Sequence, residues 1–276
     1  MVDAPLTWTP EGSRVLITGA SSGIGAATAR LLSASGAVVG LVGRREDRLA
    51  SVLADCRAHV PGCRMWVADL GDLERAEAIA LEAWDAFGAL DVLVNNAAVP
   101  KVRALRDLVP ADVEDAMRVN FFSPARMTLA VLARMVARGS GWIVNVASVG
   151  GRLGISYEAA YCASKFALSG WSESLAVDLQ GSGVEVRLVH PGPIDTDIWD
   201  RPGEPRALYY SGPKEPPDIV ARGIMSALAS DHFEHYFPEL GPVVAGKNAD
   251  LDGYLAFSAE LTRQLASGEP GGERPG

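Results

Sequence analysis

The stretch RVLIT (residues 14–18) runs directly into GASSGIG (residues 19–25), and an alanine- and leucine-rich segment follows as far as Gly36. The β-branched run predicts a buried parallel strand, and the segment up to Gly36 predicts a helix. A glycine loop between a strand and a helix indicates a dinucleotide-binding site, because glycines let the backbone approach a pyrophosphate and the helix N-terminus presents free N–H groups. A plain tight turn is the alternative for the loop taken alone.

The alternation of strand and helix continues along the chain. Further strands are expected at residues 37–42, 63–67, 91–94, 142–147, 184–189 and 234–237, and further helices at residues 45–58, 72–87, 110–138, 161–180, 219–229 and 250–265. This order predicts one α/β domain of the Rossmann type, with a doubly wound, mostly parallel seven-stranded sheet and helices on both faces. Ligands of such a sheet bind at the carboxyl ends of its strands.

We place this dinucleotide-binding domain at residues 13–240, between an N-terminal extension (residues 1–12) and a C-terminal extension (residues 241–276) whose last ten or so residues are expected to be disordered. Residues 197–218 break the alternating pattern and are rich in proline and aromatic side chains. We expect them to form a lid over an apolar substrate. A structurally passive insertion is the alternative.

The composition is that of a globular protein, with 48% hydrophobic residues, 21% charged residues and a formal net charge of −9. No basic patch is visible, so nucleic acid and anionic membrane surfaces are poor partners. The sequence contains no apolar run of about 18 residues. Its first residues lack the basic start and apolar core of a signal peptide, and we therefore expect a cytoplasmic protein.

The cysteines and histidines show no spacing typical of a disulfide framework or a metal site. We expect the cysteines to be buried or reduced thiols, the histidines to be structural or surface residues, and no metal to be bound. These residues are Cys56, Cys63, Cys162, His59, His190, His232 and His235.

The end of the second expected strand bears on which dinucleotide is bound. An acidic residue near this point suits the ribose 2′-hydroxyl of NAD, whereas an arginine suits the 2′-phosphate of NADP. Here Arg44 and Arg45 come first, and no acid follows before Glu46. Because guanidinium pairs well with phosphate, we predict that NADP(H) is favoured over NAD(H), with Arg44 as the main contact. The alternative is that both arginines are solvated residues at a helix start.

Catalytic chemistry is expected around Ser148, which follows the strand at residues 142–147, and around Tyr161 and Lys165. Four residues apart on a helix, Tyr161 and Lys165 leave the same face. An ammonium beside a phenol lowers the pKa of the phenol, which would make Tyr161 a usable proton donor and acceptor. A surface Tyr–Lys pair is the alternative. Pro124 is expected to kink the long helix beside Asn120.

Taken together, these motifs resemble the short-chain dehydrogenase/reductase family over roughly residues 12–240. The resemblance implies that the catalytic residues are Asn120, Ser148, Tyr161 and Lys165. It implies cofactor contacts at Gly19, Ser21, Ser22, Gly23, Ile24, Gly25, Asp69, Leu70, Asn95, Ala97, Tyr161, Lys165, Pro191, Gly192, Ile194 and Thr196, in addition to Arg44. Asp69 is also a candidate helix cap. Ala98 departs from the glycine that is usual in the family.

The resemblance also implies roles. Tyr161 exchanges a proton with the substrate oxygen, Ser148 hydrogen-bonds that oxygen, Lys165 binds the nicotinamide ribose, and Asn120 supports a water-linked relay through Lys165. The expected function is therefore an NADP(H)-dependent oxidoreductase that interconverts a ketone and a secondary alcohol on a small apolar, steroid-like or lipid-like molecule. The alternatives are a 3-oxoacyl thioester reductase and a non-catalytic NADP(H)-sensing protein. Family members are commonly homodimers or homotetramers, so we expect a homo-oligomer.

Overall fold

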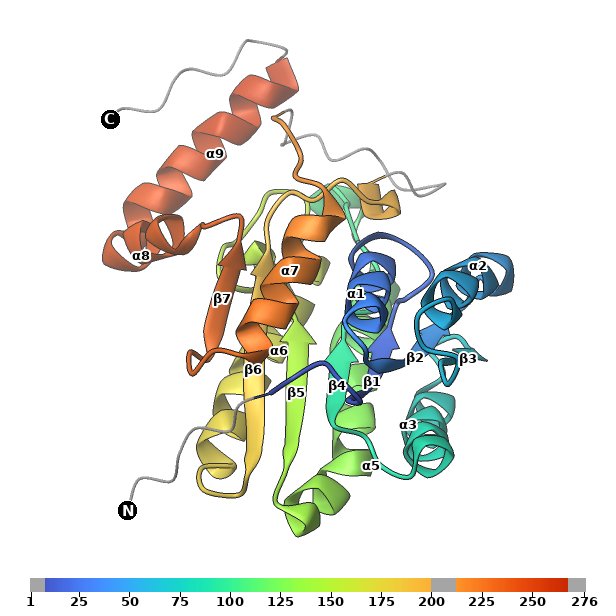
Figure 1. Cartoon of the computed structure of the whole chain (residues 1–276). Coiled ribbons are helices and arrows are strands. Elements are labelled where there is room, and N and C mark those ends of the chain that lie inside the picture. The colour runs from blue at the N-terminus through green and yellow to red at the C-terminus, as the bar shows by residue number, and fades with distance from the viewer. Residues whose placement is uncertain (1–7, 200–211, 268–276) are drawn as a thin grey trace.

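The computed structural model describes residues 8–199 and 212–267. Seven parallel strands form one sheet in the order β3-β2-β1-β4-β5-β6-β7 (Figure 1). Their bounds are β1 (Arg14–Thr18), β2 (Val38–Gly43), β3 (Arg64–Val67), β4 (Val92–Asn95), β5 (Gly141–Val146), β6 (Val184–Pro191) and β7 (Glu234–Phe237). The predicted Rossmann-type fold and the single domain are confirmed, and every strand pair is parallel.

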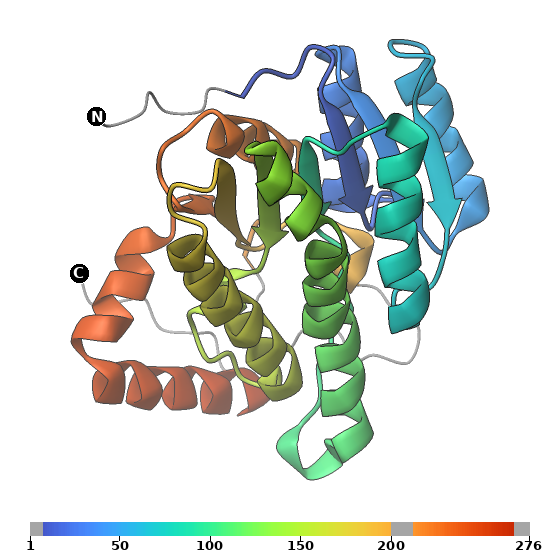
Figure 2. The same cartoon turned by 90° about the horizontal axis from the view of Figure 1, so that it is seen from below.

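Helices cover both faces of the sheet. One face carries α1 (Gly23–Ala34), α2 (Glu46–Arg57) and α7 (Pro217–Leu228). The opposite face carries α3 (Leu73–Phe87), α5 (Ser123–Arg138) and α6 (Ala159–Asp178), as Figure 2 shows, and α4 (Pro110–Met117) packs against α6. The strand order turns back between β1 and β4, so the loops after these strands part at this point and leave room for a ligand.

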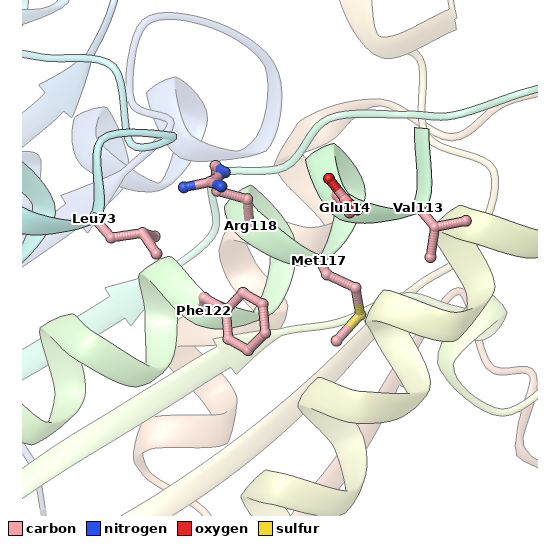
Figure 3. Close-up of a pocket in the computed structure, with 6 residues that line it drawn as sticks. All are labelled: Leu73, Val113, Glu114, Met117, Arg118 and Phe122. Atoms are coloured by element: carbon pink, nitrogen blue, oxygen red, sulfur yellow. The ribbon is translucent and has the colours of Figure 1, made fainter. Parts of the chain in front are cut away.

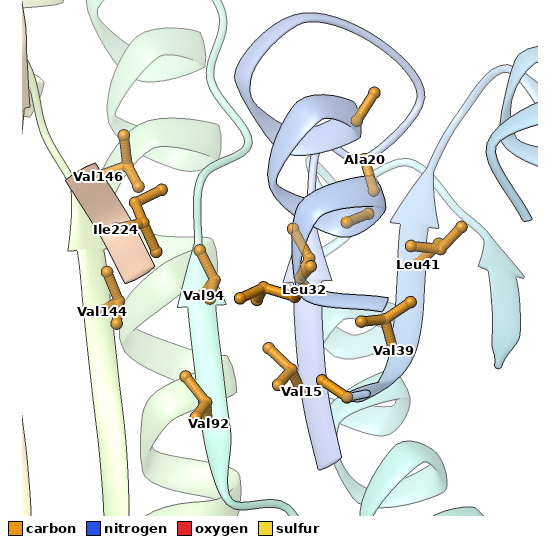
Figure 4. Close-up of a cluster of buried hydrophobic side chains, with 14 of the residues drawn as sticks. Val15, Ala20, Leu32, Val39, Leu41, Val92, Val94, Val144, Val146 and Ile224 are labelled. Atoms are coloured by element: carbon orange, nitrogen blue, oxygen red, sulfur yellow. The ribbon is translucent and has the colours of Figure 1, made fainter. Parts of the chain in front are cut away.

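Two apolar layers hold the helices to the sheet. On the α1 side, Val15, Val39, Val92 and Val144 point from four neighbouring strands toward α1 and α7 (Figure 4). Alternate strand residues such as Leu16 point to the other face, where they meet α3 and α5. Continuous apolar runs like RVLIT are typical of strands that are buried on both faces.

The structure also describes residues on both sides of the predicted domain, residues 13–240. Trp8 lies before the domain start predicted at residue 13, yet its side chain is buried in the α1-side core. The predicted C-terminal helix is present as α9 (Leu251–Ser267), and a helix that the sequence analysis missed, α8 (Gly241–Ala249), precedes it. The Tyr254 hydroxyl on α9 donates to the Gly154 carbonyl at 2.8 Å. The predicted disorder at the end of the chain concerns residues outside the described part.

The long helix predicted for residues 110–138 is divided into α4 and α5 by a π-helical turn, η2 (Arg118–Phe122). Pro124 is the second residue of α5, and because the backbone before it is already helical, its missing N–H removes one donor from the hydrogen-bond ladder of the preceding turn. The distortion therefore falls at Asn120, where the sequence predicts it, and takes the form of an inserted residue in the helical ladder.

Gly183 offers a test of this packing. Its backbone is left-handed (φ +76°), and an added Cβ would collide with the Gly139 carbonyl oxygen. Gly181 has nearly the same φ (+75°), but a Cβ there would meet nothing within 4 Å. We expect Gly181→Ala to lower the free energy of unfolding by about 1 kcal/mol and Gly183→Ala by about 3 kcal/mol or more, because only the second adds a steric overlap. Urea unfolding of both variants measures the difference, and equal losses would contradict the packing described here.

Candidate active site

Three of the four catalytic candidates come together at the carboxyl end of β5. Ser148 lies two residues after this strand and caps the short 3-10 helix η3 (Val149–Gly151) by accepting from the Gly150 N–H at 3.1 Å. Tyr161 and Lys165 lie in the first two turns of α6, as the sequence predicts. The Lys165 Nζ lies 5.8 Å from the centroid of the Tyr161 ring. The Ser148 side chain lies close enough to the Tyr161 phenol to lower the pKa of the phenol.

Lys165 is almost fully buried, with 2% of its surface exposed. Its Nζ donates to the Val146 carbonyl at 2.9 Å, and burial lowers the pKa of its ammonium to about 7. This value lies near the physiological range because desolvation penalises the charged form. The Lys165 proton is therefore easily lost, which suits a group that takes part in proton transfer.

The pKa of Tyr161 differs from the sequence-based expectation. Burial raises the pKa of this phenol, the nearby Glu158 carboxylate raises it further, and the nearby Ser148 side chain acts in the opposite direction. The sequence predicts a lowered pKa from the neighbouring ammonium. In the structure the Lys165 ammonium donates to the Val146 carbonyl and does not offset the burial. Tyr161 is thus held as a protonated phenol, the form that donates a proton to a carbonyl oxygen.

Asn120 is fully buried in the π-helical turn. Its amide Nδ2 donates to the Val99 carbonyl and to the Ser164 hydroxyl, both at 3.0 Å, and its Oδ1 accepts from the Val99 N–H at 2.8 Å. Asn120 therefore connects the turn before α5 with the segment after β4 and with α6. Its side chain holds the helix that carries Tyr161 and Lys165.

The glycine loop has the shape of a cradle for a phosphate group. A Cβ on Gly19 would lie 2.9 Å from the Ala97 Cα, and one on Gly23 would lie 2.8 Å from the Thr196 Cγ2. A Cβ on Gly25 would collide with the Gly19 carbonyl oxygen. The loop therefore excludes side chains at three positions and opens the N-terminus of α1 at Gly23. These features fit a dinucleotide pyrophosphate, with Ile24 packed into the core behind the loop.

Polar side chains at the end of β2 face this loop. Arg45 Nη2 donates to the Ser22 Oγ at 2.5 Å and to the Ser21 Oγ at 3.4 Å. Arg44 points elsewhere, with its Nη1 3.8 Å from the Asp69 Oδ2. Asp69 accepts from the Gly71 N–H and does not cap α3. That cap is Asp72, which accepts from the Arg75 N–H at 3.0 Å.

The two asparagines at the end of β4 point to different places, Asn95 into the core and Asn96 toward the glycine loop. The Asn95 side chain is buried and donates to the Thr128 Oγ1 and the Asn145 Oδ1, so it does not face the glycine loop. Asn96, which the sequence analysis did not select, donates to the Thr18 carbonyl at 2.8 Å and lies beside Gly19. The only sequence signal that could have separated the two asparagines is strand alternation, which turns neighbouring side chains to opposite faces.

The remaining predicted cofactor contacts lie around the ends of the central strands. The Ala97 N–H donates to the Thr18 Oγ1 at 3.0 Å, and the Leu70 side chain is buried toward α3. Pro191 ends β6, the Gly192 N–H donates to the Phe237 carbonyl, and Ile194 is buried against Glu215 in an isolated bridge. Most of these groups therefore shape the backbone around the site, and Thr196 borders the glycine loop.

A polar network behind Ser148 was missed by sequence reasoning. His190, classed there with the structural or surface histidines, is fully buried. Its Nδ1 lies 2.6 Å from the Ser148 carbonyl oxygen, and its Nε2 lies 2.8 Å from the Glu234 Oε1. Burial alone would raise the pKa of Glu234, but the hydrogen bonds from His190 and Arg152 lower it to about 2. These partners lie 42 to 82 residues apart along the chain.

A surface pocket of about 400 Å³ lies beside the π-helical turn (Figure 3). Its lining residues are Leu73, Val113, Glu114, Met117, Arg118 and Phe122. None of the four catalytic candidates lines it, so we assign it no part in the reaction. The three cysteines are buried free thiols, as predicted. Within the described residues, no helix is long and apolar enough to cross a membrane, and no group of three or more potential metal ligands is found.

A doubly wound parallel sheet with a glycine cradle at the N-terminus of α1 defines a dinucleotide-binding α/β protein. The family model described as short chain dehydrogenase matches residues 13–206. An uncharacterised oxidoreductase of Bacillus subtilis, YxnA, is 33% identical over 243 residues, which are 84% of this chain and 67% of that protein. The ketoacyl reductase HetN of a Nostoc species is 31% identical over 219 residues, 78% of this chain and 76% of that protein.

Solved structures agree. A short chain dehydrogenase from Burkholderia cenocepacia, crystallised in complex with NADP, superposes with a TM-score of 0.76 at 26% identity, covering 92% of this chain and 99% of that one. The chain belongs to the short-chain dehydrogenase/reductase family. It is an NAD(P)-dependent oxidoreductase that acts on a small molecule.

Proposed function

We propose that the protein is an NADP(H)-dependent oxidoreductase that interconverts a ketone and a secondary alcohol, with Tyr161 as the proton donor and acceptor. The observation that carries this proposal is that Ser148, Tyr161 and Lys165 lie together at the carboxyl end of the sheet, where the glycine loop also lies. A phenol, a hydroxyl and an ammonium at one point can serve a carbonyl oxygen that gains negative charge. The bound nicotinamide supplies or accepts the hydride.

Each residue then has a defined task in ketone reduction. The Tyr161 hydroxyl donates its proton to the carbonyl oxygen, and the Ser148 hydroxyl donates a hydrogen bond to the same oxygen. Lys165 binds the nicotinamide ribose and provides positive charge and a proton near the phenol. Asn120 fixes the segment after β4 and α6 relative to each other, and supports a water-linked relay to Lys165. In alcohol oxidation the proton moves in the opposite direction.

The preference for NADP(H) is supported by the end of β2. Arg44 and Arg45 follow this strand, and no carboxylate stands before Glu46. Arg44 is the contact that the sequence favours, and Arg45 reaches the two serines of the glycine loop. We propose that both guanidiniums meet the 2′-phosphate. The Burkholderia protein, of similar fold, was crystallised with NADP.

Two substrate classes are candidates, and a different observation supports each. An apolar, steroid-like or lipid-like ketone is the first, supported by the apolar and aromatic composition of residues 197–218, of which residues 200–211 lie outside the described part. A 3-oxoacyl thioester is the second, supported by the relative HetN, which is named a ketoacyl reductase. The net charge of −9 disfavours an acidic carrier protein as the thioester donor.

A rate screen tests the proposal. The purified protein is mixed with NADPH and with a panel of apolar ketones, steroid ketones and 3-oxoacyl thioesters, and NADPH absorbance is followed. Oxidation of NADPH with one class supports the proposal and identifies that class. Tight NADPH binding without turnover of any member would instead favour a cofactor-sensing protein, the third candidate from the sequence.

Ser148→Ala tests the oxyanion role. We expect kcat for the best ketone to fall about 100-fold, because one hydrogen-bond donor to the developing oxyanion is lost. NADPH binding should stay within about twofold. The matched control is Ser156→Ala. It removes the hydroxyl of a serine that lies shortly before α6 and to which no catalytic role is assigned. A Ser148→Ala rate equal to that of the control would remove Ser148 from the mechanism.

We also propose a homodimer or homotetramer that is built through α5 and α6. Three apolar side chains recur at seven-residue spacing, Phe122 at the end of η2 and Leu129 and Val136 on α5, and they are 45%, 56% and 41% exposed. Phe166 and Val177 are exposed on the neighbouring α6. An apolar stripe of this kind marks an interaction surface. Sedimentation velocity gives the assembly state, and a monomer at all concentrations would contradict this part of the proposal.

A further inference from the structure

Two arginines beside the glycine loop converge on one carboxylate from a distant part of the chain. Arg45 Nη1 lies 2.8 Å from the Asp197 Oδ2, and Arg48 hydrogen-bonds the same oxygen. The second terminal nitrogen of Arg45 donates to the Ser22 and Ser21 hydroxyls. Asp197 is 152 residues away from Arg45 in sequence, so the fold itself brings this anion to the end of β2.

The groups around the Asp197 carboxylate form a donor set for a phosphate. Guanidinium forks pair well with phosphate oxygens, and the serine hydroxyls lie on the loop that opens the N-terminus of α1. The end of the second strand is also where the 2′-substituent of a bound dinucleotide ribose lies in this fold. The Asp197 carboxylate is a small anion of the chain itself. It lies where this fold provides hydrogen-bond donors for the larger phosphate group of a cofactor.

The segment that carries Asp197 is fixed by several contacts. The Asp195 N–H donates to the Glu215 carbonyl at 2.8 Å, and the Trp199 indole N–H donates to the Ile194 carbonyl at 2.6 Å. Lys214 lies over the Trp199 ring, 4.6 Å from its centroid. Thr196 closes against the glycine loop at Gly23. These contacts hold the turn that carries Asp197 beside the glycine loop and the arginines.

Charge is the physical link between Asp197 and the cofactor. The Asp197 carboxylate is ionised at neutral pH, since hydrogen bonds from Arg45 and Arg48 lower its pKa. A 2′-phosphate carries up to two negative charges and would need the same guanidiniums. NADH has an uncharged hydroxyl at this position and does not need the guanidiniums of Arg45 and Arg48.

We propose that Asp197 occupies the site of the NADP(H) 2′-phosphate and is displaced when that cofactor binds, so that Asp197 limits the preference for NADP(H) over NAD(H). The inference rests on the proposed use of NADP(H). Because the Asp197 and arginine side chains are about half exposed, solvent screens the interaction and the effect is moderate. We expect removal of the carboxylate charge to tighten NADPH binding about fivefold and to leave NADH binding within about 1.5-fold.

The test is a set of fluorescence titrations with NADPH and with NADH on the full chain. Asp197→Asn removes the charge and keeps the shape, and Asp197→Ser guards against an effect peculiar to asparagine. Asp195→Asn is the matched control, because it removes the same charge from an exposed residue two positions away. We expect the ratio of the NADH to the NADPH dissociation constant to rise only in the two Asp197 variants. The gain should shrink at high salt.

The outcomes separate this inference from the proposed cofactor. If the parent prefers NADPH and the Asp197 variants match Asp195→Asn, the inference is overturned and the proposed function stands. If the parent shows no preference but the Asp197 variants acquire one, Asp197 suppresses the preference and the inference holds. If neither the parent nor the Asp197 variants prefer NADPH, both the inference and the proposed cofactor are wrong.

Discussion

Replacement of Tyr161 by phenylalanine is expected to lower kcat by about 1,000-fold or more while NADPH binding stays within about twofold. The change deletes the phenolic hydroxyl of Tyr161, and we assign proton transfer with the substrate to this hydroxyl. Positioned acid–base groups contribute roughly 100- to 10,000-fold in rate, and an effect in the upper half of that range is expected where one group serves both directions. Steady-state kinetics with the best ketone and a fluorescence titration with NADPH measure the two quantities.

The matched control is Tyr254→Phe, which removes a hydroxyl on α9 that donates to the Gly154 carbonyl, outside the catalytic group. Its kcat should stay within a few-fold of the parent value. The two variants should show similar thermal stability. A Tyr161→Phe enzyme with a kcat close to that of the control would mean that another group transfers the proton.

Replacement of Lys165 by methionine is expected to produce a second large effect, a loss of activity combined with an altered pH dependence of stability. Burial lowers the pKa of this ammonium from 10.5 to about 7. Below pH 7 both the folded and the unfolded chain carry the charge, and the folded state bears the whole desolvation penalty. Between pH 7 and 10.5 the unfolded chain binds more protons, so the free energy of unfolding of the parent rises with pH.

Methionine has similar length and no charge, so the Lys165→Met variant should lose this slope. The penalty removed at pH 6 is on the order of 4 kcal/mol from the pKa shift. The Val146 carbonyl loses its hydrogen-bond donor, which costs about 1–3 kcal/mol. We therefore expect a flatter curve and a net gain of about 2 kcal/mol at pH 6, which disappears at about pH 8.5 and becomes a net loss at higher pH, where the parent no longer bears the penalty.

Urea unfolding of the parent and the variant at pH 6, 8 and 9.5, without cofactor, measures this effect. Parallel curves would show that Lys165 does not titrate in this window. The same variant should lose at least about 100-fold in kcat, because the ribose contact and the charge near Tyr161 are both removed. A more stable but inactive variant would show that Lys165 is kept for catalysis at the expense of stability.

The local signals in the sequence were sufficient for the fold. RVLIT followed by GASSGIG predicts strand, loop and helix with little need for tertiary information, because strand burial and glycine conformation are local properties. The distortion near Asn120 was placed correctly from a proline, but its π-helical form depends on how α4 and α5 pack on the rest of the molecule. The helix α8 was missed because its glycine, proline and asparagine residues are poor helix formers.

The site was predictable where chemistry is carried by neighbours in sequence. The Tyr161–Lys165 pair follows from helical spacing alone, whereas the hydrogen bonds of His190 join β6 to β7 and to Ser148 after β5, and they have no local signature. The same reason hides the contact between Arg45 and Asp197. The pKa of Tyr161 could not be obtained from spacing, because it depends on burial and on the Glu158 carboxylate more than on the nearby ammonium.

The most direct test of the central claim is a fluorescence titration of the purified protein with NADPH and with NADH at one pH and one salt concentration. It needs no knowledge of the substrate. We predict that NADPH binds at least about tenfold more tightly than NADH, because the guanidiniums at the end of β2 favour a phosphate over a hydroxyl. Equal or tighter binding of NADH would contradict the proposed cofactor, and binding of neither would contradict the proposed enzyme.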